Sequence, residues 1–361
     1  MKDRTINIWQ AGILLFIIIF ANKILILPSL LYSGANIEGM FCYLISFLFE
    51  IGLITLFIFL KRKYPTYSFS KLVKEKLGVI TLKIVYVLIA FFFFCKLILI
   101  YNVTYIFFKD LIYKSSGNFL FLICLLPIVN YLAVCDLRSF GRTVQLFFPI
   151  IFIILLFCVI TSFIGIEGMP LFFQSNVSDV FLTTIKHTTA FGDVIFLFLF
   201  MDKIEYKKGD GKKLFFLATF AMTFVCMIML AFYFSYTYTS FMHPYAIFEI
   251  LGNVKDYGGL GRIDVVAVIL VMILTYLQMG IYLKCFTLSF HVVFPKLSDA
   301  YALTTFNGVF LILVFLLIRN LERTITYGEN FLPYLSLISF VLIPLCVIVF
   351  LVMRRKKNGK D

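Results

Sequence analysis

The chain has 361 residues, of which 62% are hydrophobic, 19% aromatic and only 14% charged, and its formal net charge is +13. A soluble domain carries roughly a quarter charged residues, so this composition excludes an ordinary soluble domain. The positive charge does not indicate a nucleic-acid partner, because the Lys and Arg residues lie in short segments between apolar runs and not on one basic face.

Apolar runs of about twenty residues follow one another along the chain, and each is long enough to cross a bilayer as an α-helix. An outer-membrane barrel would instead show alternation over segments of about ten residues. The sequence therefore predicts an all-α integral membrane protein with about ten transmembrane helices. The predicted spans are 6–33, 38–60, 84–108, 118–135, 143–166, 180–202, 214–237, 263–286, 300–318 and 333–353.

The Lys and Arg residues are divided unequally between the two sets of connecting segments. One set holds 23 of the 32, and the opposite set holds six. Because Lys- and Arg-rich loops stay in the cytoplasm, the first set and both ends of the chain are expected there, in a protein of the cell membrane. The first set consists of the amino terminus, 61–83, 136–142, 203–213, 284–299 and the carboxyl-terminal tail.

The outer connection 238–262 is the longest on the side opposite the basic loops. It has room for a short helix lying on the outer mouth, with Pro244 at its start and the glycine-rich stretch 258–261 at its end. The glycines lack the following Lys and Ser or Thr of a phosphate-binding loop, so we interpret them as a hinge.

Four ionisable residues lie near the middle of predicted spans: Lys23, Glu50, Lys96 and Asp193. A charge in hydrocarbon is costly, so such residues usually pair with one another or line a pathway. Two are basic and two acidic, and their similar depth would let them neutralise one another in one buried cluster. Pairing of Lys96 with Glu50, pairing of Lys23 with Asp193, and a role in ligand or proton handling all stay open.

Two of these charges lie at interruptions of their helices. The first span reads Ala21-Asn22-Lys23-Ile24-Leu25 and soon reaches Pro28, and the sixth reads Thr189-Ala190-Phe191-Gly192-Asp193. These positions are equivalent if the single permease domain, residues 1–361, consists of two five-helix repeats, about 6–166 and about 180–353. Broken helices at matched positions of inverted repeats indicate a substrate site at the midplane of a secondary transporter.

The breaks are suited to a ligand that carries both charges. Amides at a half-helix amino terminus favour a carboxylate, and unwound carbonyls favour an ammonium, so an amino acid matches both. The alternative is that the polar side chains only join neighbouring helices. The candidate ligand-binding residues are Asn22, Lys23, Ile24, Leu25, Phe191, Gly192 and Asp193 at the breaks, Tyr101 and Thr104 in the third span, and Thr275 and Gln278 in the eighth.

Enzymatic chemistry is not expected from this sequence. The three histidines are far apart in the predicted topology, and no Ser or Cys lies in a nucleophile motif. The eight cysteines show no metal-ligand spacing. We therefore expect no catalytic residue, no cofactor and no metal.

Several short motifs are distributed over nearly the whole chain. They are Ile6-Asn7-Ile8-Trp9-Gln10, Ile24-Leu25-Ile26-Leu27-Pro28 with Gly34, Gly141-Arg142 through Pro149, Ala190-Phe191-Gly192-Asp193 and Gly261-Arg262-Ile263-Asp264-Val265. In these motifs the chain resembles the Ger-type spore germination permeases, the B subunits of nutrient germinant receptors. It departs from that pattern at Ala21-Asn22-Lys23, where relatives commonly carry small residues with Gly, and at Asp193, where Glu is usual.

The resemblance implies the amino acid, polyamine and organocation transporter superfamily, with a LeuT-like five-plus-five inverted repeat and broken helices one and six. It implies a receptor subunit of the spore inner membrane, surrounded by membrane lipid, that binds a small nutrient such as an amino acid and triggers germination. The implied partners are a receptor A subunit and a lipoprotein C subunit. A proton-coupled amino acid permease, and a scaffold or channel subunit without a nutrient ligand, are the alternatives.

Overall fold

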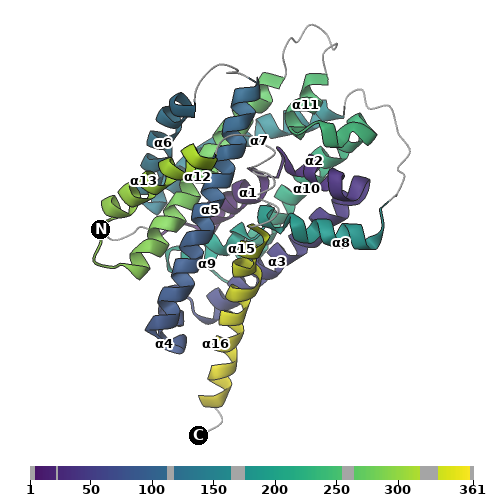
Figure 1. Ribbon diagram of the computed structural model, residues 1–361. Coiled ribbons are helices and arrows are strands. Elements are labelled where there is room, and N and C mark those ends of the chain that lie inside the picture. Colours follow the sequence, from purple (N-terminus) through teal and green to yellow (C-terminus); the bar gives the residue numbers. More distant parts are fainter. Residues whose placement is uncertain are drawn as a thin grey trace.

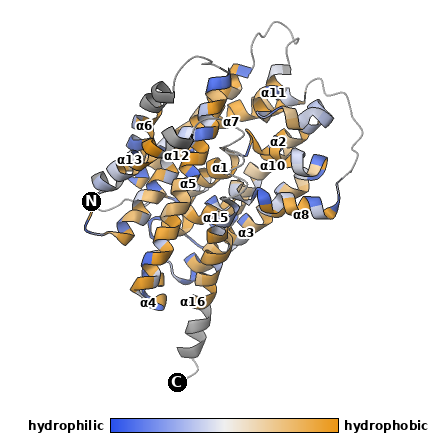
Figure 2. Ribbon diagram, in the orientation of Figure 1, coloured by the Kyte–Doolittle hydropathy of each residue, from blue (hydrophilic) through white to orange (hydrophobic). Residues whose placement is uncertain are grey.

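The computed structural model describes residues 5–21, 23–111, 118–163, 175–253, 264–317 and 332–357. Within these ranges the chain is helical, apart from connecting turns and one isolated β-bridge between Ile6 and Ile204. Six helical stretches are long and apolar enough to cross a membrane, and apolar residues cover most of the ribbon in Figure 2. The chain is therefore an all-helical membrane protein.

The first half of the chain forms five helical segments, and each coincides with a predicted span (Figure 1). The first segment is broken into two helices, and a short 3₁₀ turn, η1 (Asn36–Glu38), leads from it into the second. The helices are α1 (Ile8–Ala21) and α2 (Leu27–Ala35), then α3 (Gly39–Lys63), α5 (Val79–Leu111), α6 (Asn118–Val134) and α7 (Leu137–Ser162).

The second half repeats this pattern with a broken first member. Its sixth segment comprises α8 (Val177–Lys186), η2 (Thr188–Ala190), η3 (Asp193–Ile195), α9 (Phe196–Leu199) and η4 (Met201–Lys203). The remaining segments are α10 (Gly211–Tyr236), α12 (Asp264–Val293), α13 (Asp299–Leu317), and a tenth made of α15 (Leu332–Leu337), the π-helix η6 (Ile338–Leu342) and α16 (Ile343–Lys357).

The broken segments pack among the long helices. In one group α1 contacts α10, α2 contacts α3 and α8, and α3 contacts α8 and α10. In the other, α12 contacts α5, α6 and α13. Contacts of α1 with α12 and with α7 join the two groups, so the broken segments lie where the groups meet. A site at the breaks is consequently held by side chains from both groups.

The connection 61–83 contains a helix that the sequence did not predict, α4 (Phe69–Leu77). The Ser68 hydroxyl accepts a hydrogen bond from the Lys71 amide and caps the helix, while Phe69 and Leu72 are buried. A nine-residue amphipathic helix is too short and too charged to register as an apolar run. Several long helices also extend beyond their predicted spans. Apolar length marks only the part of a helix inside the hydrocarbon, and the helix continues past that edge.

The predicted helix in the outer connection is present as α11 (Ala246–Asn253), which begins two residues after Pro244. It follows the 3₁₀ turn η5 (Thr237–Met242) and packs on α10 and α12. The glycine-rich stretch 258–261 lies outside the described residues. The Ala246 amide donates a hydrogen bond of 2.9 Å to the Leu25 carbonyl, so α11 is joined to the break of the first segment.

Candidate functional site

The break in the first segment follows from its sequence. Helix α1 ends at Ala21, residues 23–26 form a turn, and α2 begins at Leu27 with Pro28 in its first turn. Proline has no amide hydrogen, and it is favoured at the first turn of a helix but not inside one, so a new helix starts here. Asn22 lies outside the described residues.

The break in the sixth segment depends on Gly192. Phe191 is extended, and Gly192 has a φ of 87°, in the left-handed region that glycine adopts without strain. A Cβ built on Gly192 would lie 2.2 Å from the Ser339 hydroxyl oxygen. The close approach of Ser339 therefore also requires glycine at this position. A Gly192 substitution therefore perturbs the packing of the tenth segment as well as any ligand space. This makes it a poor probe of binding alone.

Lys23 and Glu50 form the first buried ion pair at the breaks. The Lys23 ammonium nitrogen lies 2.8 Å from one Glu50 oxygen, and neither side chain is exposed. The other Glu50 oxygen accepts a hydrogen bond of 3.2 Å from the Gly192 amide. The Lys23 ammonium also lies 4.2 Å from the centroid of the Phe191 ring, within cation–π range. Helix α3 thus links the two broken segments through one carboxylate.

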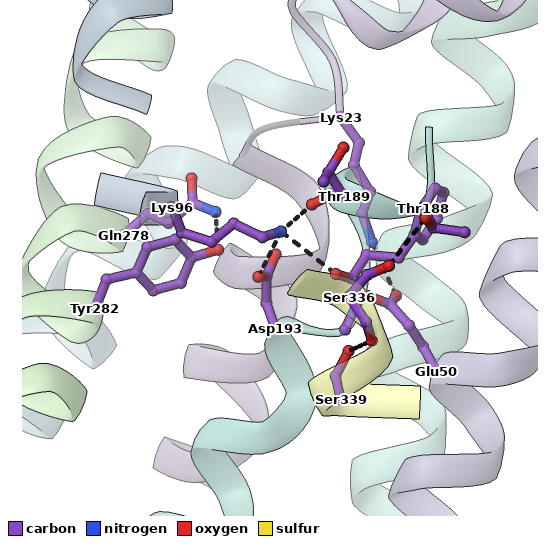
Figure 3. Close-up of polar contacts among 12 residues, drawn as sticks. Lys23, Glu50, Lys96, Thr188, Thr189, Asp193, Gln278, Tyr282, Ser336 and Ser339 are labelled. Atoms are coloured by element: carbon purple, nitrogen blue, oxygen red, sulfur yellow. Dashed lines mark hydrogen bonds and ion pairs between the residues drawn. The ribbon is translucent and has the colours of Figure 1, made fainter. Parts of the chain in front are cut away.

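Lys96 and Asp193 form the second buried ion pair, with 2.8 Å between the ammonium nitrogen and a carboxylate oxygen. The same ammonium donates to the carbonyl of Thr189 and, at 3.3 Å, to that of Phe191. Figure 3 shows Lys96 reaching into the sixth-segment break between Asp193 and Thr189. The unwound carbonyls of this segment are therefore already bonded to a cation supplied by α5.

The structure brings the four charges together in a group without net charge, but with pairs other than the two considered from the sequence. Lys23 pairs with Glu50, and Lys96 pairs with Asp193. Buried charges persist only where they are paired and hydrogen-bonded, and each of these ammonium groups has a carboxylate and a further contact. Of the pairings left open from the sequence, the structure shows neither Lys96 with Glu50 nor Lys23 with Asp193.

Helix α12 adds polar groups beside the second ion pair. The Gln278 amide nitrogen donates a hydrogen bond of 2.8 Å to the Tyr282 hydroxyl, and both residues lie next to Lys96 in Figure 3. Among the described residues nothing bonds to the Gln278 amide oxygen or to the Tyr43 hydroxyl, although both atoms are buried. The Tyr43 ring lies 5.6 Å from that of Phe191. The site thus contains unused hydrogen-bonding capacity on both sides of the sixth-segment break.

The remaining predicted ligand residues are placed differently. Ile24 and Leu25 are buried in the first-segment turn, and Thr275 is buried on α12 one turn before Gln278. Tyr101 packs its ring against Phe310 of α13. The Thr104 hydroxyl donates to the carbonyl of Ile100 within its own helix. Thr104 thus bonds within α5, and the Tyr101 ring contacts α13.

Sequence reasoning missed the contribution of the tenth segment. The Ser336 hydroxyl donates to the Thr188 hydroxyl at 2.9 Å, and the Ser339 hydroxyl donates to the Ser336 carbonyl at 2.7 Å (Figure 3). Ser339 lies in the π-helix η6, and π-helical turns often mark functional positions. Two serines three residues apart in an apolar span were the available signal, since small polar residues in membrane helices favour close helix contacts.

The basic end of the sixth segment is joined to the start of the chain by main-chain hydrogen bonds. The Ile6 amide donates to the Lys203 carbonyl, and the Glu205 amide donates to the Ile6 carbonyl, both at 2.9 Å. The Thr5 hydroxyl also donates to the Glu205 carboxylate. These bonds hold the end of the sixth segment against the start of the chain.

No protein-family model matches this chain, and no curated protein sequence matches it. The structure is similar to the crystal structure of MhsT in complex with L-phenylalanine, and MhsT is a LeuT-fold transporter. The match has a TM-score of 0.63 and covers 94% of this chain and 87% of that chain, at 15% sequence identity. The chain therefore has a LeuT-like fold, and its described residues form ten helical segments with breaks in the first and the sixth.

Proposed function

We propose that this protein binds a small nutrient, most specifically an amino acid, between its two broken segments. The observation that carries the proposal is the pair of breaks bridged by buried charges: Lys23 with Glu50, and Lys96 with Asp193. In a LeuT-like fold the amides that open α2 are suited to a carboxylate. The Gln278 oxygen and the Tyr43 hydroxyl supply unused polar groups for an ammonium.

The second part of the proposal is that this site senses its ligand without a coupling ion. In secondary transporters the unwound carbonyls coordinate sodium or a proton carrier. Here the Thr189 and Phe191 carbonyls accept hydrogen bonds from Lys96, a cation that belongs to the protein. From the sequence alone Lys23 was the candidate for this role, but Lys23 bonds to Glu50 instead. A built-in charge removes the need for a driving ion.

A sensor needs only that its ligand favour one conformation, which partner subunits then read. Together with the sequence resemblance, this leads us to propose a membrane subunit of a spore germinant receptor, located in the spore inner membrane. Its partners would be the receptor A subunit and the lipoprotein C subunit. In this proposal the ion-pair group holds the breaks in place until ligand binding changes their packing.

A thermal-shift screen of the full-length protein in detergent against amino acids, nucleosides and sugars tests the ligand class. We expect stabilisation by at least one amino acid, and loss of that shift in Gln278→Leu, which removes the buried amide while keeping a side chain of similar size. Tyr131→Phe is the matched control, because the Tyr131 side chain on α6 is 71% exposed. Stabilisation by nucleosides or sugars alone would reject the amino acid as ligand.

A proton-coupled amino acid permease is the second candidate function. It is favoured by the structural similarity to MhsT, a transporter that was crystallised with L-phenylalanine. The same fold serves sensing and transport, so the fold does not decide between them. Accumulation of ligand by the purified protein alone, driven by a proton gradient, would support the permease.

A further inference from the structure

A pocket whose lining includes none of the residues named at the breaks lies where three of the predicted cytoplasmic connections begin. Its volume is about 630 Å³, within the range of small-molecule sites. The walls come from the end of α6, the end of the sixth segment, the last turns of α12 and the start of α13. The pocket begins six residues past Gln278 on a different face of α12, so it is separate from the proposed nutrient site.

Among the described residues, the lining of this pocket is more basic than acidic. Lys203, Lys284 and His291 line it, and Asp136 is the acidic residue among the described lining. The Lys284 ammonium donates to the carbonyls of Ala133 and Cys135 at the end of α6, which fixes this cation at the wall. Fixed cations of this kind bind phosphate groups as point charges.

The remaining wall is apolar, with Phe200, Leu288 and Val292 facing the same space. A soluble anion would make no use of such a wall, whereas a lipid presents a phosphate next to its apolar chains. The pocket also lies at the basic end of the bundle, where the cytoplasmic leaflet presents anionic head groups. Basic pockets between membrane helices on that side bind such head groups.

We propose that this pocket binds the phosphate of an anionic membrane phospholipid through Lys203, Lys284 and His291. Because these residues belong to α12 and to the end of the sixth segment, the lipid would hold these two elements together. This site is independent of the proposed nutrient site, so either can fail in an experiment without the other.

Native mass spectrometry of the full-length protein, re-lipidated with equal amounts of phosphatidylglycerol and phosphatidylcholine, tests the proposal. We expect the wild type to retain one phosphatidylglycerol selectively. Replacing Lys203 and His291 together by glutamine should weaken its retention by roughly fivefold or more, the change expected when a juxtamembrane charge is lost. Lys203→Arg keeps the charge and should keep the lipid, which separates loss of charge from misfolding.

Lys74→Gln is the matched control, since Lys74 is an exposed lysine of α4 that does not line the pocket. Equal retention of both lipids by the wild type, or unchanged retention in the double variant, would overturn the proposal. In a second arm inorganic phosphate is titrated into protein held in phosphatidylcholine nanodiscs. Stabilisation by phosphate that depends on Lys203 and His291, without selective lipid retention, would reject the lipid as the source of the phosphate.

Discussion

Replacing Lys96 by methionine leaves the Asp193 carboxylate without its partner, in a site where both side chains are at most 2% exposed. Breaking a buried ion pair from one side typically costs about 3 to 5 kcal/mol, because the remaining charge loses its compensation. The substitution also removes a donor from the Thr189 and Phe191 carbonyls. We therefore expect Lys96→Met to lower the free energy of unfolding in mixed micelles by about 3 to 5 kcal/mol.

A second substitution, Asp193→Asn, should recover part of this loss by removing the uncompensated charge. The loss in the double variant should fall below the sum of the single losses by about 0.5 to 3 kcal/mol, the coupling typical of residues in contact. Combining Lys96→Met with Glu50→Gln should show less coupling, since Glu50 bonds to Lys23.

The control is a Lys–Asp pair with the same separation, in which the aspartate is 9% exposed but the lysine reaches solvent. Lys213 and Asp210 are also 2.8 Å apart, yet the Lys213 side chain is 41% exposed. Solvent-exposed ion pairs contribute about 0 to 1 kcal/mol to stability. We therefore expect Lys213→Met to lower the free energy of unfolding by less than about 1 kcal/mol. Strictly additive losses for Lys96 and Asp193, or equal costs for Lys96→Met and Lys213→Met, would refute the buried pairing.

Three further expectations address the backbone, the topology and the ion. Gly192→Ala should destabilise the protein by roughly 1 to 2 kcal/mol or more, because Gly192 has a positive φ and lies against Ser339. Gly52→Ala should not destabilise it, since the space around Gly52 is open. Equal thermal stabilities of the two variants would contradict this expectation. Reporter fusions within 61–83 and after residue 353 should both report cytoplasm, and an outside signal from either would overturn the orientation. The thermal shift caused by the identified ligand should be the same in sodium and in choline buffers, and a sodium requirement would contradict the internal cation.

The segment order and both breaks could be predicted from the sequence, because apolar length and the positions of Gly192 and Pro28 are local properties. The short helix α4 was not predictable from apolar length, since it carries several lysines and only one buried face. Its cap at Ser68 was the local signal that hydropathy alone does not weigh.

The pairing of the four charges required the structure. Which lysine meets which carboxylate depends on the rotation of α3 and α5 about their axes and on the path of the unwound chain, and neither is a local property. The position of Tyr101 relative to Lys96 could be predicted from helix geometry. Five residues after Lys96, it lies about 140° around the helix from that lysine, so the two side chains could not be expected on one face. The contribution of Ser339 depended on the close approach of the tenth segment, which no sequence period encodes.

In the proposed sensor, Lys96 supplies within the site the charge that a coupling ion supplies in a transporter. The most direct measurement is uptake of the identified ligand into liposomes containing this protein alone, with and without imposed proton and sodium gradients. We expect ligand binding without gradient-driven accumulation. Accumulation at ordinary transporter rates under either gradient would contradict it and favour the permease.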